Sequence, residues 1–354
     1  MMTLRMFAAP PKSIPMATMW YLTDLAEAKG KQELFTRQSP QRLKAMREHA
    51  MIESAISSNR IEGVEIDAKR VGTVIFGKPA LRDRGEVEVA GYRDALKMVH
   101  EQGSRLKLTE ETILRLHRLW RGEVRDAGQY KAKDVDIIET YAEGGSRVRF
   151  KPVPAKRTPA AMAELISLWD AALIERPVHP LIALAAFNLD FLCIHPFRDG
   201  NGRVSRLLLL LTCYHLGFEV GRYISLERLI EQNKERYYET LEHSSRGWHE
   251  GKHDPWLYIN HLLNILKLAY REFEQRVGQV KAPRGEKTAM VFEAIGRLAD
   301  PFSVAGLQGQ CPGVGLDLIR KILKQQRGLG RVECTGMGPS AAWRKTGPWK
   351  EGSG

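Results

Sequence analysis

The sequence is poor in cysteine and lacks any apolar run long enough to cross a membrane. Its four cysteines, at positions 193, 213, 311 and 334, lie far apart without the close spacing of zinc ligands, which argues against a disulfide framework or a cysteine metal site. The leucine run 207–211 is much shorter than the roughly 18–20 apolar residues of a membrane helix. The first residues show no continuous apolar core or small-residue cleavage site typical of a signal peptide. We therefore expect a cytoplasmic protein with no membrane partner.

The sequence also lacks internal repeats and low-complexity segments, and its acidic residues are outnumbered. The 54 Lys and Arg residues against 42 Asp and Glu residues give a formal net charge of +12. This excess favours acidic partners such as nucleotides, nucleic acid or an anionic protein surface, although a soluble protein with a basic surface fits as well. With 354 residues, of which 43% are hydrophobic, the chain is long and apolar enough for two or three domains and a sizeable core.

Helical patterns dominate the chain as far as about residue 278, which predicts a mainly α protein. Apolar residues at helical spacing, together with capping signals, predict helices over about 19–28, 40–57, 84–103, 109–120, 158–175, 180–193, 204–216, 224–245 and 254–277. One stretch differs, because two β-leaning runs around Ala-Glu-Gly-Gly-Ser predict a β-hairpin over 135–150. We divide this region into an N-terminal helical part, 1–83, and a core, 84–278.

The composition changes at 279–286, a Gly-, Pro- and Lys-rich stretch that lacks large apolar residues and predicts a linker. In the last segment, 287–354, three helical patterns precede two β-leaning pieces, which is the layout of a small winged helix-turn-helix domain. Its basic residues offer a phosphate-contacting face for DNA: Arg320, Lys321, Lys324, Arg327, Arg331, Arg344 and Lys345. The alternative is a small packing or dimerisation domain with a basic surface.

Residues with chemical potential concentrate in the polar segment Ile194–Arg206, IHPFRDGNGRVSR, which lies between two apolar helical runs. Gly200-Asn201-Gly202 falls between the two expected helices, where flexible backbone and unpaired N–H groups at a helix start form an anion site suited to phosphate. Arg203 and Arg206 are three residues apart on one helix face, where both can bind phosphate oxygens. The segment therefore predicts a polyphosphate site.

Two further side chains complete a set for phosphoryl chemistry. Asp199 can hold a Mg²⁺ ion that bridges phosphates, because Mg²⁺ takes one or two carboxylates plus substrate oxygens. His195 has an ordinary pKa that suits a general base at neutral pH. Singly, each feature has a plain structural explanation, such as a helix end, a turn or a solvated face, but their combination between two buried helices favours a site. The pair supplies too few ligands for zinc, and the Gly-Lys-Ser/Thr of a Walker A motif is missing.

The segment matches the signature H-x-F-x-[DE]-G-N-G-R-x-x-R at every defined position and thereby resembles the Fic family. The resemblance covers roughly residues 50–270 and implies a helical bundle with a β-hairpin flap. Fic proteins mostly transfer AMP from ATP to a protein hydroxyl, which implies His195 as the base, Asp199 as the Mg²⁺ ligand and Phe197 as the side chain that anchors the loop in the core. The remaining motif residues would bind the phosphates: Gly200, Asn201, Gly202, Arg203 and Arg206.

Three stretches outside the motif also resemble family features. The segment 58–63 fits the inhibitory pattern [ST]-x-x-x-E-[GN], which implies that Ser58 and Glu62 belong to an inhibitory helix and that Glu62 pairs with Arg206 and blocks productive γ-phosphate binding. The hairpin matches the flap that pairs with a target segment, with a simple surface hairpin as the alternative. Its residues Arg147, Val148, Arg149 and Phe150 would lie over the nucleotide. Tyr237 and Tyr238 match the adenine pocket, although we expect one of the two to be core.

The sequence thus predicts a self-inhibited protein adenylyltransferase that uses ATP and Mg²⁺ and modifies a Tyr, Ser or Thr hydroxyl of a target protein or of itself. Three alternatives stay open: a DNA-binding regulator with the Fic core as a nucleotide sensor, an enzyme with another phosphate-containing donor, and removal of AMP with Glu62 placing a water. A homodimer is also left open.

Overall fold

The computed structural model describes residues 1–36, 40–77, 80–140, 144–278, 286–311, 314–336, 341–347 and 349. The chain forms two compact units, Met1–Gln275 and Arg276–Gly354. Both consist mainly of helices with small antiparallel sheets, which confirms the predicted mainly α class. Within the described ranges, no helix is both long and apolar enough to cross a membrane.

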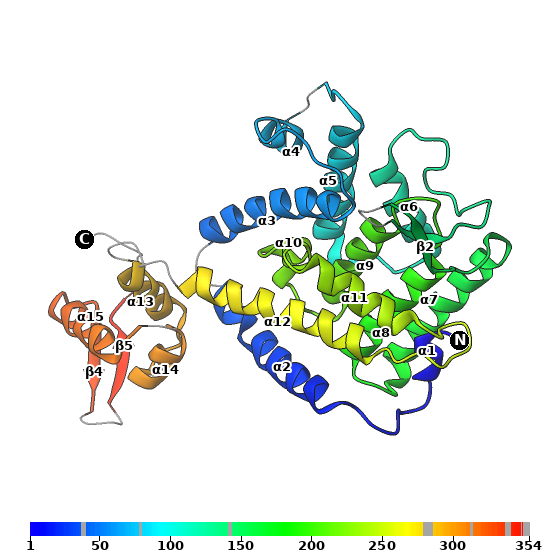
Figure 1. The fold of residues 1–354 in the computed structure, drawn as a ribbon. Coiled ribbons are helices and arrows are strands. Elements are labelled where there is room, and N and C mark those ends of the chain that lie inside the picture. The colour runs from blue at the N-terminus through cyan, green and yellow to red at the C-terminus, as the bar shows by residue number, and fades with distance from the viewer. Residues whose placement is uncertain are drawn as a thin grey trace. The chain divides into compact units, whose positions relative to one another are not determined.

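The first unit is a bundle of helices in which segments distant in the sequence pack together (Figure 1). In chain order the helices are α1 (Thr3–Met6), α2 (Met16–Thr36), α3 (Pro40–Ile61), α4 (Val71–Phe76), α5 (Arg84–Gln102), α6 (Glu110–Arg121), α7 (Thr158–Glu175), α8 (Pro180–Ile194), α9 (Asn201–His215), α10 (Leu226–Glu231), α11 (Lys234–Ser245) and α12 (Trp256–Gly278). Single 3₁₀ turns lie at Gly103–Arg105, Ala155–Arg157 and Val220–Arg222.

The two apolar runs around the motif form α8 and α9, which are buried on nearly all sides. Every side chain from Leu181 to Ile194 is buried, as is every side chain from Arg203 to Tyr214. The start of α8 follows from Pro180 in its first turn and from the His179 side chain, which accepts a hydrogen bond from the Leu181 N–H. Burial stabilises the fold by about 1.5–3 kcal/mol for each large apolar side chain, so these two helices hold the loop between them in place.

The predicted hairpin is present and consists of β1 (Ile137–Thr140) and β2 (Ser146–Phe150). The strands pair antiparallel, with Ile138 opposite Val148, and the register shifts between Ile137 and Ile138. Residues 141–143, which belong to the predicted turn, lie outside the described residues. Ile138 and Val148 are both exposed, so this face of the hairpin presents apolar side chains to solvent.

Four helices differ from the sequence prediction. The helix expected over 40–57 continues to Ile61 in α3, and the helix expected over 224–245 is divided into α10 and α11. The helix expected over 19–28 extends over Met16–Thr36, because tertiary contacts of buried Leu22 and Leu25 outweigh its weak periodicity. The last difference concerns the motif, where α9 begins at Asn201 rather than at about residue 204. Gly200 lies immediately before it with a φ of 82°, so Asn201 and Gly202 belong to the first helical turn rather than to a loop between helices.

The second unit contains α13 (Glu286–Arg297), β3 (Phe302–Ser303), α14 (Val304–Gly309), α15 (Leu316–Gly328), β4 (Val332–Thr335) and β5 (Ala342–Lys345). The strands form one antiparallel sheet in the order β3-β5-β4. The sequence predicted β4 and β5 but missed β3, because two residues are too short to show an alternating pattern. Buried apolar side chains from the helices and from β3 and β4 form its core. Except for Glu286, which begins α13, the predicted linker 279–286 lies outside the described residues.

Candidate active site

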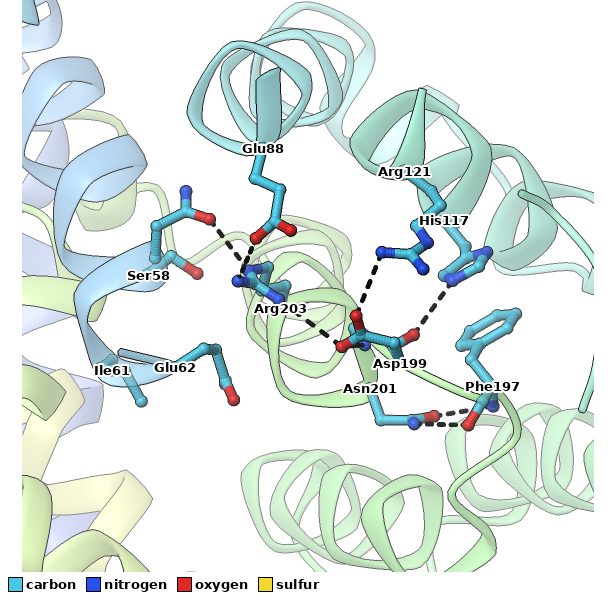
Figure 2. A network of polar contacts seen from close by, with 12 residues as sticks. Ser58, Ile61, Glu62, Glu88, His117, Arg121, Phe197, Asp199, Asn201 and Arg203 are labelled. Atoms are coloured by element: carbon cyan, nitrogen blue, oxygen red, sulfur yellow. Dashed lines mark hydrogen bonds and ion pairs between the residues drawn. The ribbon is translucent and has the colours of Figure 1, made fainter. Parts of the chain in front are cut away.

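The motif loop turns sharply between α8 and α9, and two residues take left-handed backbone conformations. His195 has a φ of 51° and Gly200 a φ of 82°. A Cβ atom at position 200 would lie 2.0 Å from Cζ3 of Trp120, so only glycine fits there. The Asn201 side chain closes the loop, because its Oδ1 accepts from the Phe197 N–H at 2.9 Å and its Nδ2 donates to the Phe197 carbonyl at 2.8 Å. Figure 2 shows this paired contact.

His117 of α6 holds the same loop from the opposite side. Its ring stacks on the buried Phe197 ring with centroids 3.9 Å apart, and its Nε2 lies 3.1 Å from the Asp199 carbonyl oxygen. Since Nδ1 accepts from the Gly128 N–H at 2.9 Å, the neutral ring carries its proton on Nε2 and donates to Asp199. Burial lowers the pKa of His117 to about 4, so the ring stays neutral at physiological pH.

The Asp199 carboxylate lies among positively charged side chains at the edge of the site (Figure 2). Its Oδ2 is 3.1 Å from Arg121 Nη1 and 3.4 Å from Arg84 Nη2, and its Oδ1 is 3.9 Å from Arg203 Nη1. The side chain is 38% exposed, so the carboxylate can still reach a bound ion. No cluster of three or more metal-binding side chains occurs among the described residues. One exposed carboxylate suits Mg²⁺ that arrives with nucleotide phosphates and water, and it does not suit a metal held by protein alone.

Arg203 lies deep in the unit rather than at an open surface. Its Nη2 donates to Glu88 Oε2 of α5 at 2.7 Å, and its Nε donates to Asn59 Oδ1 of α3 at 2.9 Å. The guanidinium also lies over the Trp120 ring, 4.5 Å from its centroid. The sequence analysis assigned Arg203 to the phosphates, whereas its guanidinium here binds side chains of α3 and α5.

Arg206 is also buried, and its partners come from the end of α3. Its Nε donates to Ser58 Oγ at 2.9 Å, and its Nη2 donates to the Ser58 carbonyl at 2.9 Å and to Glu62 Oε1 at 2.8 Å. The ion pair between Glu62 and Arg206 that the inhibitory pattern implied is therefore present. Arg206 Nη1 is buried and has no hydrogen-bond partner in the described part of the chain. This atom is a donor that a phosphate oxygen could satisfy.

The Glu62 carboxylate also lies against the first turn of α9. A Cβ atom at Gly202 would be only 2.2 Å from Glu62 Oε1, so the absence of a side chain there leaves the space that the carboxylate fills. The N–H groups of a first helical turn lack partners within the helix and attract anions. Glu62 thus fills the space beside the first turn of α9.

His195 directly follows the last turn of α8 and is half-buried. Its pKa is lowered to about 4, mainly because the ring is buried and secondly because of the positive charge of Lys131, while the negative charge of Glu62 acts in the opposite direction. Its Nδ1 has no hydrogen-bond partner among the described residues. The imidazole is therefore neutral at physiological pH, with a ring nitrogen that can accept a proton.

Part of the chain, including the motif loop, matches a known protein family. A family model described as "Fic/DOC family" matches residues 107–213, a range that contains α8, the motif loop and most of α9. Residues 107–213 therefore form a Fic/DOC-family domain. The chain is 26% identical over 200 residues to "Protein adenylyltransferase Fic" of Nematostella vectensis, which covers 54% of this chain and 42% of that protein. It is also 26% identical over 163 residues to the protein of the same name in Drosophila willistoni, covering 45% of this chain and 29% of that protein.

Solved Fic structures share this fold. A Fic family protein from Desulfovibrio desulfuricans is 25% identical with a TM-score of 0.62 and covers 96% of this chain and 98% of its own. A Fic domain containing signalling protein from Bacteroides thetaiotaomicron is 19% identical with a TM-score of 0.60, covering 73% of this chain and all of its own. The chain therefore matches one solved structure along nearly its full length, although it spans less than half the length of these two curated relatives.

The two tyrosines assigned to the adenine pocket of the Fic domain differ in burial. Tyr237 is 3% exposed and packs against Tyr258, with ring centroids 6.1 Å apart. Tyr238 is half-buried, and its hydroxyl lies 3.4 Å from the Ile61 carbonyl at the end of α3. As expected, one of the two belongs to the core, and it is Tyr237. Tyr238 is the one with a partly accessible ring.

Two of the predicted flap residues of β2, Arg149 and Phe150, contact aromatic side chains elsewhere in the first unit. The Arg149 guanidinium lies 5.1 Å from the Tyr238 ring centroid, which brings β2 next to the predicted adenine pocket. Phe150 stacks on His249 with centroids 5.5 Å apart, while Arg147 forms ion pairs with Glu139 and Glu242. Val148 is exposed. Of the four residues predicted over the nucleotide, Arg149 has the clearest contact with the site.

Sequence reasoning missed most of the side chains that hold the charged motif residues of this Fic domain. They come from several distant elements: Asn59, Arg84, Glu88, His117, Trp120, Arg121 and Lys131. None lies in a motif-like stretch apart from Asn59, which falls inside the inhibitory pattern. Their roles depend on the packing of α3, α5 and α6 around α9, which local sequence does not specify.

Proposed function

We propose that this Fic protein transfers AMP from ATP to a Tyr, Ser or Thr hydroxyl of a target protein, and to itself, and that Glu62 restrains the reaction. The observation that carries the proposal is the contact of Glu62 with both Arg206 and the first turn of α9. A carboxylate at that position mimics a phosphate and competes with one. The names of the curated relatives support the same activity at the level of the family.

In the proposed reaction the target hydroxyl oxygen attacks the α-phosphorus of ATP. The new P–O bond forms as the bond to the bridging oxygen of the β-phosphate breaks, and pyrophosphate leaves. His195 takes the hydroxyl proton, which its neutral ring allows at physiological pH. The first turn of α9 and Arg206 orient the phosphates, and this positioning supplies much of the rate. A Mg²⁺ ion held by Asp199 would add positive charge beside the phosphates.

Restraint by Glu62 has a direct electrostatic cause. As long as Glu62 pairs with Arg206 Nη2 and lies over Gly202, a phosphate cannot use the same donor and the same space. Withdrawal of Glu62 would expose a buried guanidinium whose Nη1 is already unpaired. The nucleotide would then satisfy both groups in a productive pose.

The hairpin β1–β2 is the proposed docking element for the target. Its exposed Ile138 and Val148 offer apolar contacts, and a two-stranded ribbon can extend its pairing to an incoming segment. Backbone pairing holds a target side chain in place with little demand on the target sequence. This mode suits an enzyme that modifies a hydroxyl in an extended loop.

The direct test is incubation of the full chain with radiolabelled ATP, CTP, UTP and GTP in parallel. The wild type, Glu62→Gly and Glu62→Gly/His195→Ala are compared. We expect strong labelling of Glu62→Gly with ATP and none after loss of His195. Labelling with another nucleotide instead would favour a different donor, and the absence of labelling with every nucleotide would contradict a transferase. Loss of label from AMP-bearing Glu62→Gly after addition of wild type would reveal removal of AMP that depends on Glu62.

A second candidate function concerns the second unit and rests on one face of α15. Five exposed basic residues lie on this helix and just beyond it: Arg320, Lys321, Lys324, Arg327 and Arg331. The opposite face, with Ile319, Ile322 and Leu323, is buried in the core of the unit. None of the five has an ion-pair partner among the described residues, so the stripe is available for phosphates of duplex DNA.

Binding of a fluorescent duplex by the full chain at several salt concentrations tests this second function. We expect affinity to fall with salt, and Lys324→Ala to lower the slope of log K against log salt by about one. Lys287→Ala, which removes an exposed charge from α13 instead, serves as the control. Absence of salt-dependent binding, or equal slopes for both variants, would exclude DNA contact by α15.

A further inference from the structure

Lys131, in the segment between α6 and β1, contacts the backbone of His195. Its side chain is buried, with 5% exposed. Its Nζ donates to the Ile194 carbonyl at 3.1 Å and to the His195 carbonyl at 2.8 Å, and its own backbone N–H donates to the Pro196 carbonyl at 2.9 Å. One residue thus binds three successive carbonyl groups at the point where α8 ends.

These contacts bear on the conformation of His195. The last carbonyls of a helix have no partner within the helix, and a cation near them is favourable. His195 has a left-handed φ of 51°, which costs a residue with a side chain roughly 1–2 kcal/mol. The Lys131 ammonium donates directly to the carbonyls on either side of the Cα atom of His195, which favours the turn that brings these two carbonyls together. Without Lys131, Ile194 and His195 would present buried carbonyls with no charged donor.

Lys131 also belongs to the set of charges that face the His195 ring. Burial is the largest cause of the lowered pKa of His195, and the charge of Lys131 is the second. Arg149 of β2 acts in the same direction, while Glu62 and the Leu192 carbonyl oppose it. The pKa of Lys131 itself is lowered to about 8 by burial, with Asp134 opposing, so Lys131 keeps its charge at neutral pH.

We propose that Lys131 is a positioning residue for the proposed AMP transfer. Lys131 holds the His195 backbone in its left-handed turn and places a positive charge near the ring. The inference rests on the proposed role of His195 as the base. It assigns to Lys131 two separable effects, one on the geometry of the base and one on its protonation. A lysine that only capped α8 would stabilise the fold and leave both properties of His195 unchanged.

The test compares Lys131→Met and Lys131→Arg with Lys133→Met, a matched control that removes an exposed lysine two residues away. The titration of the His195 ring is followed by NMR in the full chain, with its signal assigned from His195→Ala. We expect the His195 titration to move to higher pH in Lys131→Met, because a positive charge is lost, and to stay in place in Lys133→Met. In Lys131→Arg the charge remains, so the titration should stay close to that of the wild type.

The same substitutions are then made in Glu62→Gly, and AMP incorporation is measured against pH. We expect kcat to fall about 100-fold in Lys131→Met, since small displacements of a catalytic group cost about this much, with KM for ATP little changed. The acidic limb of the pH profile should move upward together with the His195 titration. Lys133→Met should match Glu62→Gly alone.

The outcomes separate this inference from the proposed function. If Glu62→Gly incorporates no AMP, the proposed function fails, while the NMR titration still decides whether Lys131 acts on His195. If folded Lys131→Met shows an unchanged titration and an unchanged kcat, the inference is overturned. Should Lys131→Met fail to fold, Lys131→Arg decides, because a bulkier cation should displace the loop carbonyls and lower kcat with the titration retained. A wild-type kcat in Lys131→Arg would contradict the positional effect.

Discussion

Arg203 and Arg206 lie one turn apart on α9, and both are buried and paired with a carboxylate, yet their surroundings differ. Arg203 pairs with Glu88 in the second turn of α5, and the side chain of Glu88 is 5% exposed. Arg206 pairs with Glu62 just beyond the end of α3, whose side chain is 27% exposed. A carboxylate within a helix cannot leave without disturbing that helix, whereas one beyond a helix end can. We conclude that Glu88 with Arg203 is a structural pair and Glu62 with Arg206 a releasable one.

The largest expected effect concerns the structural pair. Glu88→Gln leaves the charge of Arg203 buried and without its carboxylate, and loss of one partner of a buried pair costs about 3–5 kcal/mol. We expect the free energy of unfolding in urea to fall by this amount, without a gain in AMP incorporation. Arg84→Gln, which removes the exposed partner that Glu88 shares with Asp199, is the control and should change stability little. A stable Glu88→Gln variant would place Glu88 among the releasable contacts.

The next largest effect concerns the releasable pair and is measured as the affinity for ATP. Glu62→Gly frees a charged donor worth about 1.5–3 kcal/mol, so ATP should bind about 10- to 100-fold more tightly than to the wild type. Calorimetric titration with ATP measures this change. The thermal midpoint of the variant should also rise more with ATP than that of the wild type, because binding to the folded state stabilises it. Equal affinities would show that Glu62 does not compete with a phosphate.

Acid should lower the free energy of unfolding of the first unit without any substitution, because several of its histidines are buried in the neutral form. Burial lowers the pKa of His100 to about 3 and those of His117 and His195 to about 4. The unfolded chain therefore binds more protons below about pH 6.5, and each group lowers stability by up to about 1.4 kcal/mol per pH unit between its unfolded and folded pKa. Asp190 opposes this between pH 6 and 4, because burial raises its pKa to about 6 and the folded chain takes up that proton first. Thermal midpoints measured from pH 7.5 to 5 should fall; constant midpoints would contradict the burial of neutral histidines.

The smallest expected effect concerns the Ser58 hydroxyl, which contacts Arg206 beside Glu62. Ser58→Ala removes the hydroxyl that accepts from Arg206 Nε but leaves the Ser58 carbonyl and Glu62 in place. The lost hydrogen bond is worth about 1 kcal/mol, so AMP incorporation should rise only a few-fold, roughly fivefold, over the wild type. Ser57→Ala, at the neighbouring buried serine, is the matched control for loss of a hydroxyl in the same turn. A rise as large as that of Glu62→Gly would shift the main inhibitory contact to Ser58.

The sequence predicted the releasable pair but not the structural pair. Helices with capping residues or prolines at their boundaries, such as α5, α7 and α8, were predicted closely. The pairing of Glu62 with Arg206 was also expected, because both residues belong to short patterns that resemble the Fic family. Glu88 and Lys131 could not be found in this way. An acid within an amphipathic helix and a lysine in a loop read as solvated side chains, and only the packing of α5 and of the segment after α6 against the motif buries them.

The start of α9 shows a different kind of limit. Gly200-Asn201-Gly202 has the composition of a turn, so local propensity placed the helix after it. The helix nevertheless begins at Asn201, because the Asn201 side chain satisfies the backbone of Phe197 and Gly200 takes the left-handed conformation against Trp120. Tertiary contacts thereby outweigh the low helix propensity of glycine and asparagine.

The most direct test of the difference between the two arginines is the initial rate of AMP incorporation into wild type, Glu62→Gly and Glu88→Gln, measured side by side by intact mass spectrometry. Rates are expressed per folded molecule, with the folded fraction taken from circular dichroism of the same samples. We predict that Glu62→Gly is modified at least about tenfold faster than wild type, as expected for loss of about 1.5 kcal/mol of competition, and that Glu88→Gln is no faster than wild type. An acceleration in Glu88→Gln equal to that in Glu62→Gly, or none in Glu62→Gly, would contradict the assignment of Glu62 as the releasable partner.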